Sequence, residues 1–508
     1  MKNEETQSME WSNKWTFVLA AIGSAVGLGN IWRYPTIVFN NGGGAFFIPY
    51  FIAFFVAGLP MLILEFVLGA RMRGTAPLAY ARITNKRWEF LGWIPTVVAA
   101  MIVFFYVVIL AWAVNFIYFA FNTSWGDASN AQNFFMNEFL GSTGNPLDLG
   151  AMNWWVALAL LALWGGTYFV MAKGIKGGLE KANNILLPLF FLSLLILLVW
   201  GVTLDGAANG LNALFTPDFA RLTDTSIWIA AFGQIFFSLS VCMGIMVAYG
   251  SYLPKDGEIV NTALIIGFAD ILMSMIAATA VFSILGYMAT AQGVEVAEVV
   301  TAGAGLVFMV FPAAFSLMGA VGPWFGTFFF VALLVAGWTS FISLLEAFSQ
   351  PFVEKFNMER KKMFAYTCAF GFLASLLYAT GAGIHLLGIV NYVIDYFLMI
   401  GGFLQVLVCF WLYKKAPDFK EFANRNAAVK LGAWWDVLAK YVFPIIVLVI
   451  VSQWVDAFVN GTAQNFPTEV LIFVHGGTAV LMIVAVILFS AIKWKKDIYE
   501  DVDTEEAV

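Results

Sequence analysis

Long apolar runs separated by short polar connections repeat along the whole chain. A helix needs roughly 20 mainly apolar residues to cross the hydrocarbon of a bilayer, and these runs are long enough. A helix also satisfies its own backbone hydrogen bonds where no water is present. The pattern therefore predicts an all-α polytopic membrane protein with about twelve spans, at residues 15–39, 43–70, 89–121, 152–171, 180–202, 226–250, 258–289, 324–353, 362–381, 385–413, 433–458 and 466–493.

The composition agrees with this pattern. Of the 508 residues, 61% are apolar and 11% are charged, which is too little charge for a water-soluble surface. Cys242, Cys368 and Cys409 lie within apolar runs, and an odd number of such cysteines argues against a disulfide scaffold. The chain has no Cys/His metal spacing, phosphate-binding loop or nucleophile motif, so we expect neither an enzyme nor a nucleic-acid-binding protein.

Lys and Arg concentrate in alternate connections, around 71–87, 173–181, 355–362 and 414–430. Cytoplasmic loops carry this excess, so both termini are expected on the cytoplasmic side of the cell membrane. The connection 122–151 is polar and is expected outside, whereas 290–323 is more apolar and is interpreted as an external lid. The predicted parts are a cytoplasmic segment 1–14, five spans in 15–202, an external loop 203–225, five spans in 226–413, two spans in 414–493 and a cytoplasmic tail 494–508.

Two spans are predicted to be broken near their middle. In the first, the stretch Gly23–Asn30 contains three glycines, each of which costs about 1 kcal/mol relative to alanine inside a helix. In the sixth, the stretch 234–244 combines serines with Gly244. Breaks at corresponding positions of two five-span halves indicate a 5+5 inverted-repeat transporter with a binding site near the midplane. The alternative is that these small residues only allow close packing of helices.

Polar groups inside the spans are few. Thr339 and Ser340 could bond back to carbonyls of the preceding turn, or they could offer oxygens to a sodium ion. Ionisable groups inside a membrane are costly and usually have a function. Those of this chain are Arg33, Glu65, Asp270, Glu346 and Asp395, of which Glu346 is expected near the cytoplasmic water line.

These stretches resemble the signatures of the neurotransmitter:sodium symporter family, and the resemblance covers nearly the whole chain. The matching stretches are Gly23–Pro35, Asn41–Tyr50, Gly58–Glu65, Gln234–Ser238 and Ala336–Ser340. The resemblance implies sodium-coupled uptake of a small molecule through the inverted-repeat fold. A homodimer is compatible with it.

The resemblance also implies specific roles. One sodium ion would bind Ala25, Asn30, Ser238 and Asp270, and a second would bind Gly23, Val26, Ala336, Thr339 and Ser340. The implied substrate-binding residues are Ser24, Ala25, Gly27, Leu28, Gly29, Ile102, Tyr106, Phe237, Ser238, Ser240, Met243, Ser340 and Leu344. Arg33, Asp395 and Phe237 would form an outer gate, and Glu65 would bind amides at the break in the sixth span.

Two positions refine the expected activity. Gly27 stands where monoamine carriers of the family place an Asp, so we expect a substrate that brings its own carboxylate. Ile102, Met243 and Leu344 would form an apolar wall around it, which favours an uncharged, hydrophobic α-amino acid. Asp270 replaces an Asn that is common in the family, and it lies beside the equivalents of the chloride ligands of animal relatives, Tyr50, Gln234, Ser238 and Ser274. A fixed carboxylate there would offset the charge of sodium, which predicts chloride-independent transport. If Asp270 gives up a proton inside the cell, transport could also be coupled to proton antiport.

The family's cytoplasmic Arg is missing, because Ser8 occupies its place while its acidic partner Glu354 remains. Lys14 or Lys2 is the expected substitute. A proton-coupled carrier, a non-transporting amino acid sensor and a channel are the alternative functions; the Asn30, Thr339 and Ser340 oxygens argue against the first, and the absence of a large soluble domain argues against the second. No continuous hydrophilic stripe supports a channel.

Overall fold

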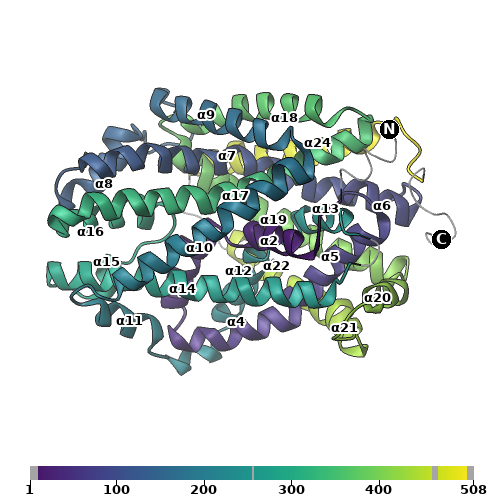
Figure 1. The fold of residues 1–508 in the computed structure, drawn as a ribbon, viewed down its shortest axis with the longest axis horizontal. Coiled ribbons are helices and arrows are strands. Elements are labelled where there is room, and N and C mark those ends of the chain that lie inside the picture. The colour runs from purple at the N-terminus through teal and green to yellow at the C-terminus, as the bar shows by residue number, and fades with distance from the viewer. Residues whose placement is uncertain (1–9, 255–256, 460–466, 500–508) are drawn as a thin grey trace.

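The computed structural model describes residues 10–254, 257–459 and 467–499, and it is helical almost throughout (Figure 1). In the following, η denotes a 3-10 or π-helical turn. The first half contains α2 (Lys14–Ala25), η1 (Gly29–Arg33), α3 (Tyr34–Asn40), η2 (Gly44–Phe46), α4 (Phe47–Ala53), η3 (Phe54–Gly58), α5 (Leu59–Met72), α6 (Ala76–Thr84), α7 (Phe90–Asn122), η4 (Ala128–Asn130), α8 (Ala131–Asn133), η5 (Phe134–Phe139), α9 (Trp154–Met171), η6 (Ile175–Glu180), α10 (Lys181–Gly201), α11 (Ala207–Phe215) and η7 (Phe219–Thr223).

The second half contains α12 (Thr225–Ser238), α13 (Ile245–Ser251), α14 (Val260–Gln292), α15 (Val296–Val299), η8 (Leu306–Val310), α16 (Phe311–Leu317), η9 (Gly319–Val321), α17 (Gly322–Phe356), α18 (Arg360–Ser375), η10 (Leu376–Ala379), α19 (Gly383–Val406), η11 (Leu407–Leu412), α20 (Ala416–Asn424), α21 (Ala433–Val437), η12 (Leu438–Val442), α22 (Phe443–Val459), α23 (Thr468–Val470), η13 (Leu471–Gly476) and α24 (Gly477–Ala491). Among the described residues the only β-pairing is two isolated bridges, so the predicted all-α class is confirmed.

Ten helices in the described ranges are long and apolar enough to cross a membrane. The bent pair Lys14–Ala25 and Gly29–Asn40 makes an eleventh span, with an angle of 46° between its halves. The sixth predicted span consists of α12 and α13, and α12 has only 14 residues, too few to cross a bilayer alone. Twelve spans are therefore reached when both broken pairs are counted.

The long helices run side by side, and short elements cover the two ends of the bundle. Figure 1 shows α8, α11, α15 and α16 at one end, called the α16 end below, and α6, α20 and α21 at the other, called the α6 end. Both ends of the described chain reach the α6 end, because Glu10 lies 4.0 Å from Arg73, and Arg82 donates to the carbonyl of Ile498. The connection predicted as a lid, 290–323, lies at the α16 end.

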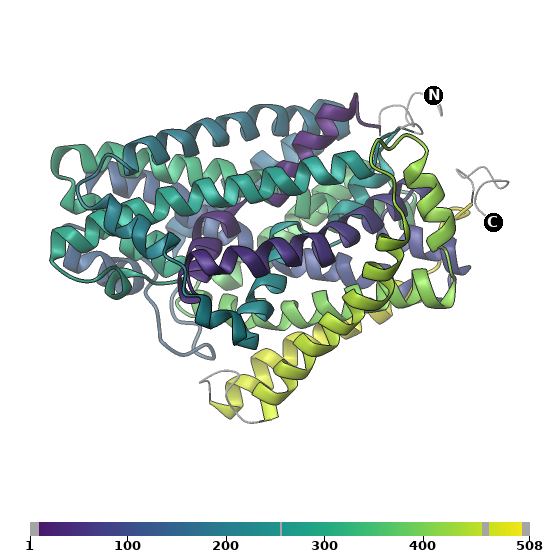
Figure 2. The ribbon, with the colours of Figure 1, turned by 90° about the horizontal axis from the view of Figure 1, so that it is seen from below.

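The core of the bundle surrounds α7 and the two broken spans. Helix α7 packs against α17 and α19, and α2 packs against α10, α14 and α17. Helices α22 and α24, the yellow-green and yellow helices of Figure 2, lie along one edge, and their spans are the least buried. The first ten spans therefore build most of the interior, and the last two pack at its edge.

Candidate functional site

A cavity of about 380 Å³ lies between the breaks in the first and sixth spans. Its lining comes from α2, η1, α7, the α12–α13 break, α17 and α19. Every residue predicted to bind substrate lines it: Ser24, Ala25, Gly27, Leu28, Gly29, Ile102, Tyr106, Phe237, Ser238, Ser240, Met243, Ser340 and Leu344. The structure thus brings together residues that are more than 300 positions apart in the sequence.

The break in the first span begins where α2 ends. Val26 has an extended backbone, with φ −88° and ψ 107°, which stops the helix. The amide of Gly27 then donates to Oδ1 of Asn30 at 2.8 Å, so a side chain replaces the missing helical acceptor. Helical structure resumes at Gly29, where a Cβ would lie 2.6 Å from the ring of Phe237. Glycine is therefore required at Gly29 by the close approach of that ring.

The break in the sixth span, residues 239–244, has a strained backbone. Ser240 and Cys242 have positive φ values of 52° and 65°, a conformation that is rare for residues other than glycine. Gly244, with φ 75°, caps the start of α13. The amide of Cys242 donates to Oε1 of Glu65, which is 1% exposed, at 2.6 Å. The predicted role of Glu65 at this break is confirmed.

The residues of the first predicted sodium site form one buried polar cluster. Asp270 accepts from Ser238 Oγ at 2.7 and 2.8 Å and from Asn30 Nδ2 at 2.9 Å. Asn30 Nδ2 also lies 2.6 Å from Ser274 Oγ. Because Oδ1 of Asn30 accepts from Gly27, the amide must turn over before that oxygen can face an ion beside Asp270. Ala25 lines the cavity next to this cluster.

The residues of the second predicted sodium site also meet, behind the cavity wall. Ser340 Oγ lies 3.4 Å from the carbonyl oxygen of Gly23 and 3.3 Å from that of Ser24. Thr339 Oγ1 donates to the carbonyl of Ala336 at 2.7 Å, the bond to the preceding turn that the alternative interpretation expects. Gly23, Val26, Ala336 and Thr339 are all buried. Hydroxyls and carbonyls from α2 and α17 thus converge, and such neutral oxygens suit a sodium ion.

The polar end of the cavity presents groups that the protein leaves unpaired. The hydroxyls of Ser24 and Tyr106 are buried and have no hydrogen-bond partner among the described residues. A Cβ on Gly27 would clash with Ser340 Oγ and lie 3.3 Å from the Tyr106 hydroxyl. A buried polar group normally has a partner, so these hydroxyls are candidates to bind a ligand.

The cavity extends toward the α16 end. There it is lined by Ala302–Ala304 of the connection predicted as a lid, and by residues of α3 and α19. The guanidinium of Arg33 lies 4.6 Å from the centre of the Phe237 ring, as predicted for the gate. In the described structure Arg33 and Asp395 form no ion pair within 4.0 Å, so the predicted gate is not closed.

The resemblance alone did not identify the part of the lining nearest the α16 end. Phe105, Ile109 and Trp112 line the cavity, and the indole nitrogen of Trp112 has no partner among the described residues. Together with Ile102 these residues are three or four positions apart on α7. The helical period would have identified this stripe once Ile102 was placed on the cavity.

The α6 side of the cavity is closed by the segment before α2. Trp11 is 2% exposed, its backbone amide donates to the carbonyl of Tyr252, and its indole donates to the carbonyl of Tyr249, each at 3.0 Å. Lys14 forms an ion pair with Glu258, which lowers the pKa of that carboxyl. The prediction that Lys14 replaces the missing Arg beside Glu354 is therefore wrong, because Lys14 lies next to a different acid. Ser8 and Lys2 lie outside the described residues.

Two acids near the end of α17 have partners that the sequence did not reveal. Glu354 accepts hydrogen bonds from the amide and the hydroxyl of Thr75, the residue before α6. These two donors at the start of α6 stand where a basic side chain was expected. Glu346 is fully buried and pairs with Arg360 at 2.5 Å, and the hydroxyl of Tyr252 donates to it at 2.6 Å. The place of Glu346 near the cytoplasmic water line stays a prediction; its side chain is shielded from water, and Arg360 at the start of α18 balances its charge.

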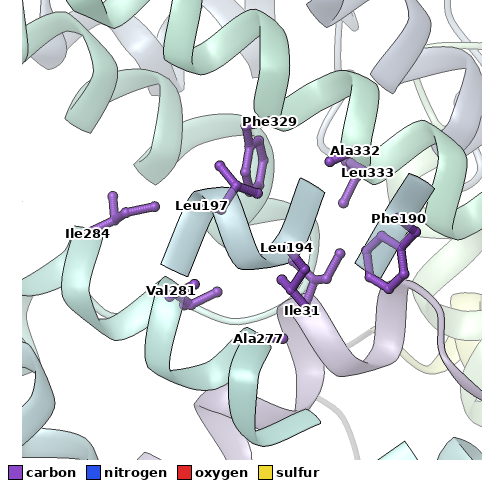
Figure 3. A pocket seen from close by; sticks show the side chains of 11 residues that line it. Ile31, Phe190, Leu194, Leu197, Ala277, Val281, Ile284, Phe329, Ala332 and Leu333 are labelled. Atoms are coloured by element: carbon purple, nitrogen blue, oxygen red, sulfur yellow. The ribbon is translucent and has the colours of Figure 1, made fainter. Parts of the chain in front are cut away.

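A second, much smaller cavity lies beside the first break. Its volume is about 10 Å³, and Figure 3 shows only carbon side chains around it. The lining residues are Ile31, Phe190, Leu194, Leu197, Ala277, Ala280, Val281, Ile284, Phe329, Ala332 and Leu333. A space of this size without polar groups is a packing gap between α10, α14 and α17, and it is no candidate binding site.

The chain is similar to known sodium-dependent transporters over most of its length. It is 36% identical over 464 residues to an uncharacterized sodium-dependent transporter of Methanocaldococcus jannaschii, covering 91% of this chain and 94% of that protein. It is 31% identical over 452 residues to the sodium- and chloride-dependent taurine transporter of Canis lupus familiaris, with 80% and 72% covered. It is also 31% identical over 428 residues to the human sodium- and chloride-dependent GABA transporter 2, with 77% and 71% covered.

The family model described as the sodium:neurotransmitter symporter family matches residues 8–133 and 124–497, which include both breaks and the whole cavity. The resemblance seen in the sequence is confirmed, and an activity as an enzyme is excluded because the family consists of transporters. The chain belongs to the sodium:neurotransmitter symporter family.

Proposed function

We propose that this chain takes up an uncharged, hydrophobic α-amino acid together with sodium by alternating access. The observation that carries the proposal is the polarity of the cavity. The unpaired hydroxyls of Ser24 and Tyr106 line the same cavity as the apolar side chains of Ile102, Met243 and Leu344. An α-amino acid with an apolar side chain likewise combines polar groups with an apolar part.

The absence of a side chain at Gly27 favours a substrate with an acidic group. Ser340 and Tyr106 fill the space that a side chain at this position would need, so no carboxylate can stand there to bind an amine. The amides of Leu28 and Gly29, at the start of the resumed helix, are oriented to favour an anion. Taurine and GABA, named for two relatives, also carry an acidic group and an amine.

Two sodium ions are proposed for the two oxygen clusters. The first, beside Asp270, is completed by the substrate's carboxylate, so ion and substrate bind the same state of the protein. The second has no carboxylate and holds its ion more weakly. Shared ligands make the binding of sodium and substrate mutually favourable, and this linkage lets a sodium gradient drive uptake.

Chloride independence is proposed from Asp270 and its neighbours. Tyr50 and Gln234 are buried beside the cluster, and their polar side-chain atoms have no partner among the described residues. Asp270 already supplies a negative charge there, which offsets the charge of a sodium ion. The names of the two mammalian relatives include chloride, whereas the name of the archaeal relative includes only sodium.

The orientation is proposed from the charges. The connections rich in Lys and Arg lie at the α6 end, which is therefore cytoplasmic, and both chain ends reach it. The cavity then opens to the outside, and the protein is set to collect substrate for the cell.

Uptake into proteoliposomes tests these proposals. The purified protein is supplied with each of the twenty amino acids under an inward gradient of Na⁺, or of K⁺ as the control. We expect uptake of hydrophobic amino acids with Na⁺ only. Uptake that is equal in Na⁺ and K⁺ for every amino acid would contradict sodium coupling.

The same vesicles, with chloride replaced by gluconate, test the role of Asp270. We expect unchanged uptake by the native protein and chloride-dependent uptake by Asp270→Asn, because the variant lacks the fixed charge. Loss of most native uptake in gluconate would contradict chloride independence. The Thr339→Val, Ser340→Ala double variant should need more sodium for half-maximal uptake, and an unchanged sodium requirement would argue against the second site.

A further inference from the structure

Asn183 is a buried amide whose oxygen has no partner among the described residues. It lies on α10 and is 0% exposed. Its Nδ2 donates to the carbonyl of Leu179, one turn earlier, at 3.0 Å. This bond fixes the orientation of the amide, because the reverse orientation would set two oxygens against each other. Oδ1 therefore points away from its own helix as an unused acceptor.

The unused oxygen lies against Gly23, one of the residues of the predicted second sodium site. A Cβ on Gly23 would lie 2.5 Å from Oδ1 of Asn183 and 3.5 Å from Cβ of Thr339. Gly23 and Thr339 come from α2 and α17, and α10 packs against both helices. The missing side chain of Gly23 thus leaves room for the Asn183 oxygen beside the carbonyls and hydroxyls that already converge there.

We propose that Asn183 supplies a further oxygen to the second sodium site, so that α10 holds the ion together with α2 and α17. The inference rests on the sodium coupling proposed above. A hard cation such as Na⁺ prefers oxygen ligands, and an amide carbonyl is a strong neutral one. Leaving a buried acceptor unpaired costs stability, and a bound ion would remove that cost.

This assignment connects the ion to the closed end of the bundle. Glu180, three residues before Asn183, accepts from the amide of Ser12 at 3.1 Å. Ser12 follows Trp11 in the segment that covers the α6 side of the cavity. An ion that holds the start of α10 against α2 therefore also stabilises the contact between α10 and this segment, and release of the ion weakens it.

Sodium binding to single variants tests the assignment. Asn183→Leu removes the oxygen with little change in volume, and Asn183→Asp keeps an acceptor but loses the donor to Leu179. Asn184→Ala is the matched control, because Asn184 is the next residue of the same helix and is exposed. The readout is the sodium concentration that gives half of the full rise in unfolding temperature, measured without substrate.

We expect Asn183→Leu to raise this concentration about tenfold, Asn183→Asp to keep it at or below the native value because a carboxylate oxygen also binds sodium, and Asn184→Ala to leave it within about twofold of the native value. Substrate affinity at saturating sodium should change little in all three. If the Asn183 amide only stabilises α10 through its hydrogen bond to Leu179, then Asn183→Asp and Asn183→Leu will lower the unfolding temperature equally, and both will keep the native sodium requirement. That result would overturn the assignment. If Asn183→Leu does not fold, Asn183→Ala with the same readout replaces it.

A double variant and hydrogen exchange sharpen the test. If Asn183 and Thr339 hold one ion, the effects of Asn183→Leu and Thr339→Val on the sodium requirement will not add, whereas independent effects would overturn the assignment. Sodium should also slow amide exchange in residues 175–190 and 11–16 of the native protein but not of Asn183→Leu. A native protein that ignores sodium in every assay contradicts the proposed function itself, whereas a native response retained in Asn183→Leu contradicts only the role of Asn183.

Discussion

The two ends of the bundle close the central cavity to different degrees. At the α16 end the cavity continues past Phe237 to α3, α19 and the lid, and Arg33 and Asp395 form no ion pair with each other. At the α6 end Trp11, the pair Glu346–Arg360 and the segment before α2 separate the cavity from the surface. The structure is therefore open toward the side that we propose is external and closed toward the cytoplasm.

The difference lies in the kind of contact. Beside the aromatic packing of Trp11 on Phe17, Tyr249 and Tyr252, the closed end is held by single hydrogen bonds and ion pairs. Such contacts can be exchanged one at a time, whereas a packed core resists partial opening. We infer that the closed end is a latch, and four substitutions test this comparison, from the largest expected effect to the smallest.

Glu346→Gln should have the largest effect, because it leaves the charge of Arg360 unpaired inside the bundle. Breaking a buried ion pair by removing one partner costs about 3–5 kcal/mol. We expect a lower unfolding temperature and faster labelling of a cysteine at Ser343, which is fully buried. Glu359→Gln is the control, since its pair with Lys362 is exposed. Equal effects of the two variants would show that Glu346 does not hold the α6 end closed.

Trp11→Phe should have an intermediate effect. The ring remains, but the carbonyl of Tyr249 loses its indole donor and keeps only the amide of Tyr252, at a cost of about 0.5–1.5 kcal/mol. Labelling of the same cysteine at Ser343 should become faster, though less than with Glu346→Gln. Trp15→Phe, at an exposed Trp four residues away, should change nothing. If Trp11→Phe behaves like Trp15→Phe, the indole donor is not part of the latch.

Arg33→Lys tests the open end. The positive charge remains, but the contact between the planar guanidinium and the Phe237 ring is lost. Such a cation–π contact contributes about 0.5–1 kcal/mol. Bound substrate should therefore dissociate a few times faster, as measured with radiolabelled amino acid on the solubilised protein. Arg221→Lys, in an exposed pair with Asp224, should dissociate substrate at the native rate. A native rate in Arg33→Lys would remove Arg33 from the gate.

Lys14→Ala should have the smallest effect, below about 0.5 kcal/mol, because its pair with Glu258 is partly exposed. The pKa of Glu258 is lower in the folded protein than in the unfolded chain. Its contribution to stability is therefore complete above the ordinary carboxyl pKa of about 4.3 and is lost as the pH falls through the folded value. The native protein and Lys14→Ala should differ slightly in unfolding temperature at pH 7 and converge in acid; a difference that grows in acid would have the wrong sign.

Hydrophobic pattern was enough to predict the spans, and glycines were enough to predict the breaks. A helix in lipid must satisfy its own backbone, so its length and its interruptions leave a strong signal in the sequence. The cavity lining was also predicted, but through the resemblance. Periodicity alone does not say that the face of α7 with Ile102 meets the break in the sixth span with Met243. Only the assembled bundle shows that every residue predicted to bind substrate lines one space.

Pairing of charges could not be predicted in the same way. Lys14 had several acids within reach of a mobile side chain, and the sequence does not rank Glu258 above Glu354. The ion pair of Glu346 was not predicted, because its partner Arg360 belongs to another helix. The amide of Asn30 is a related case, because the sequence does not say whether its oxygen or its nitrogen faces Asp270. Such details depend on tertiary distances of a few ångströms.

Gly27 limits how this protein could acquire a different substrate. The space beside it is occupied by the hydroxyls of Ser340 and Tyr106, so any larger residue at position 27 clashes before it can contribute a new interaction. An acid added there would first require a smaller residue at Ser340, and Ser340 is also a proposed ligand of the second sodium ion. A change of substrate class through position 27 would then also change the proposed ion site.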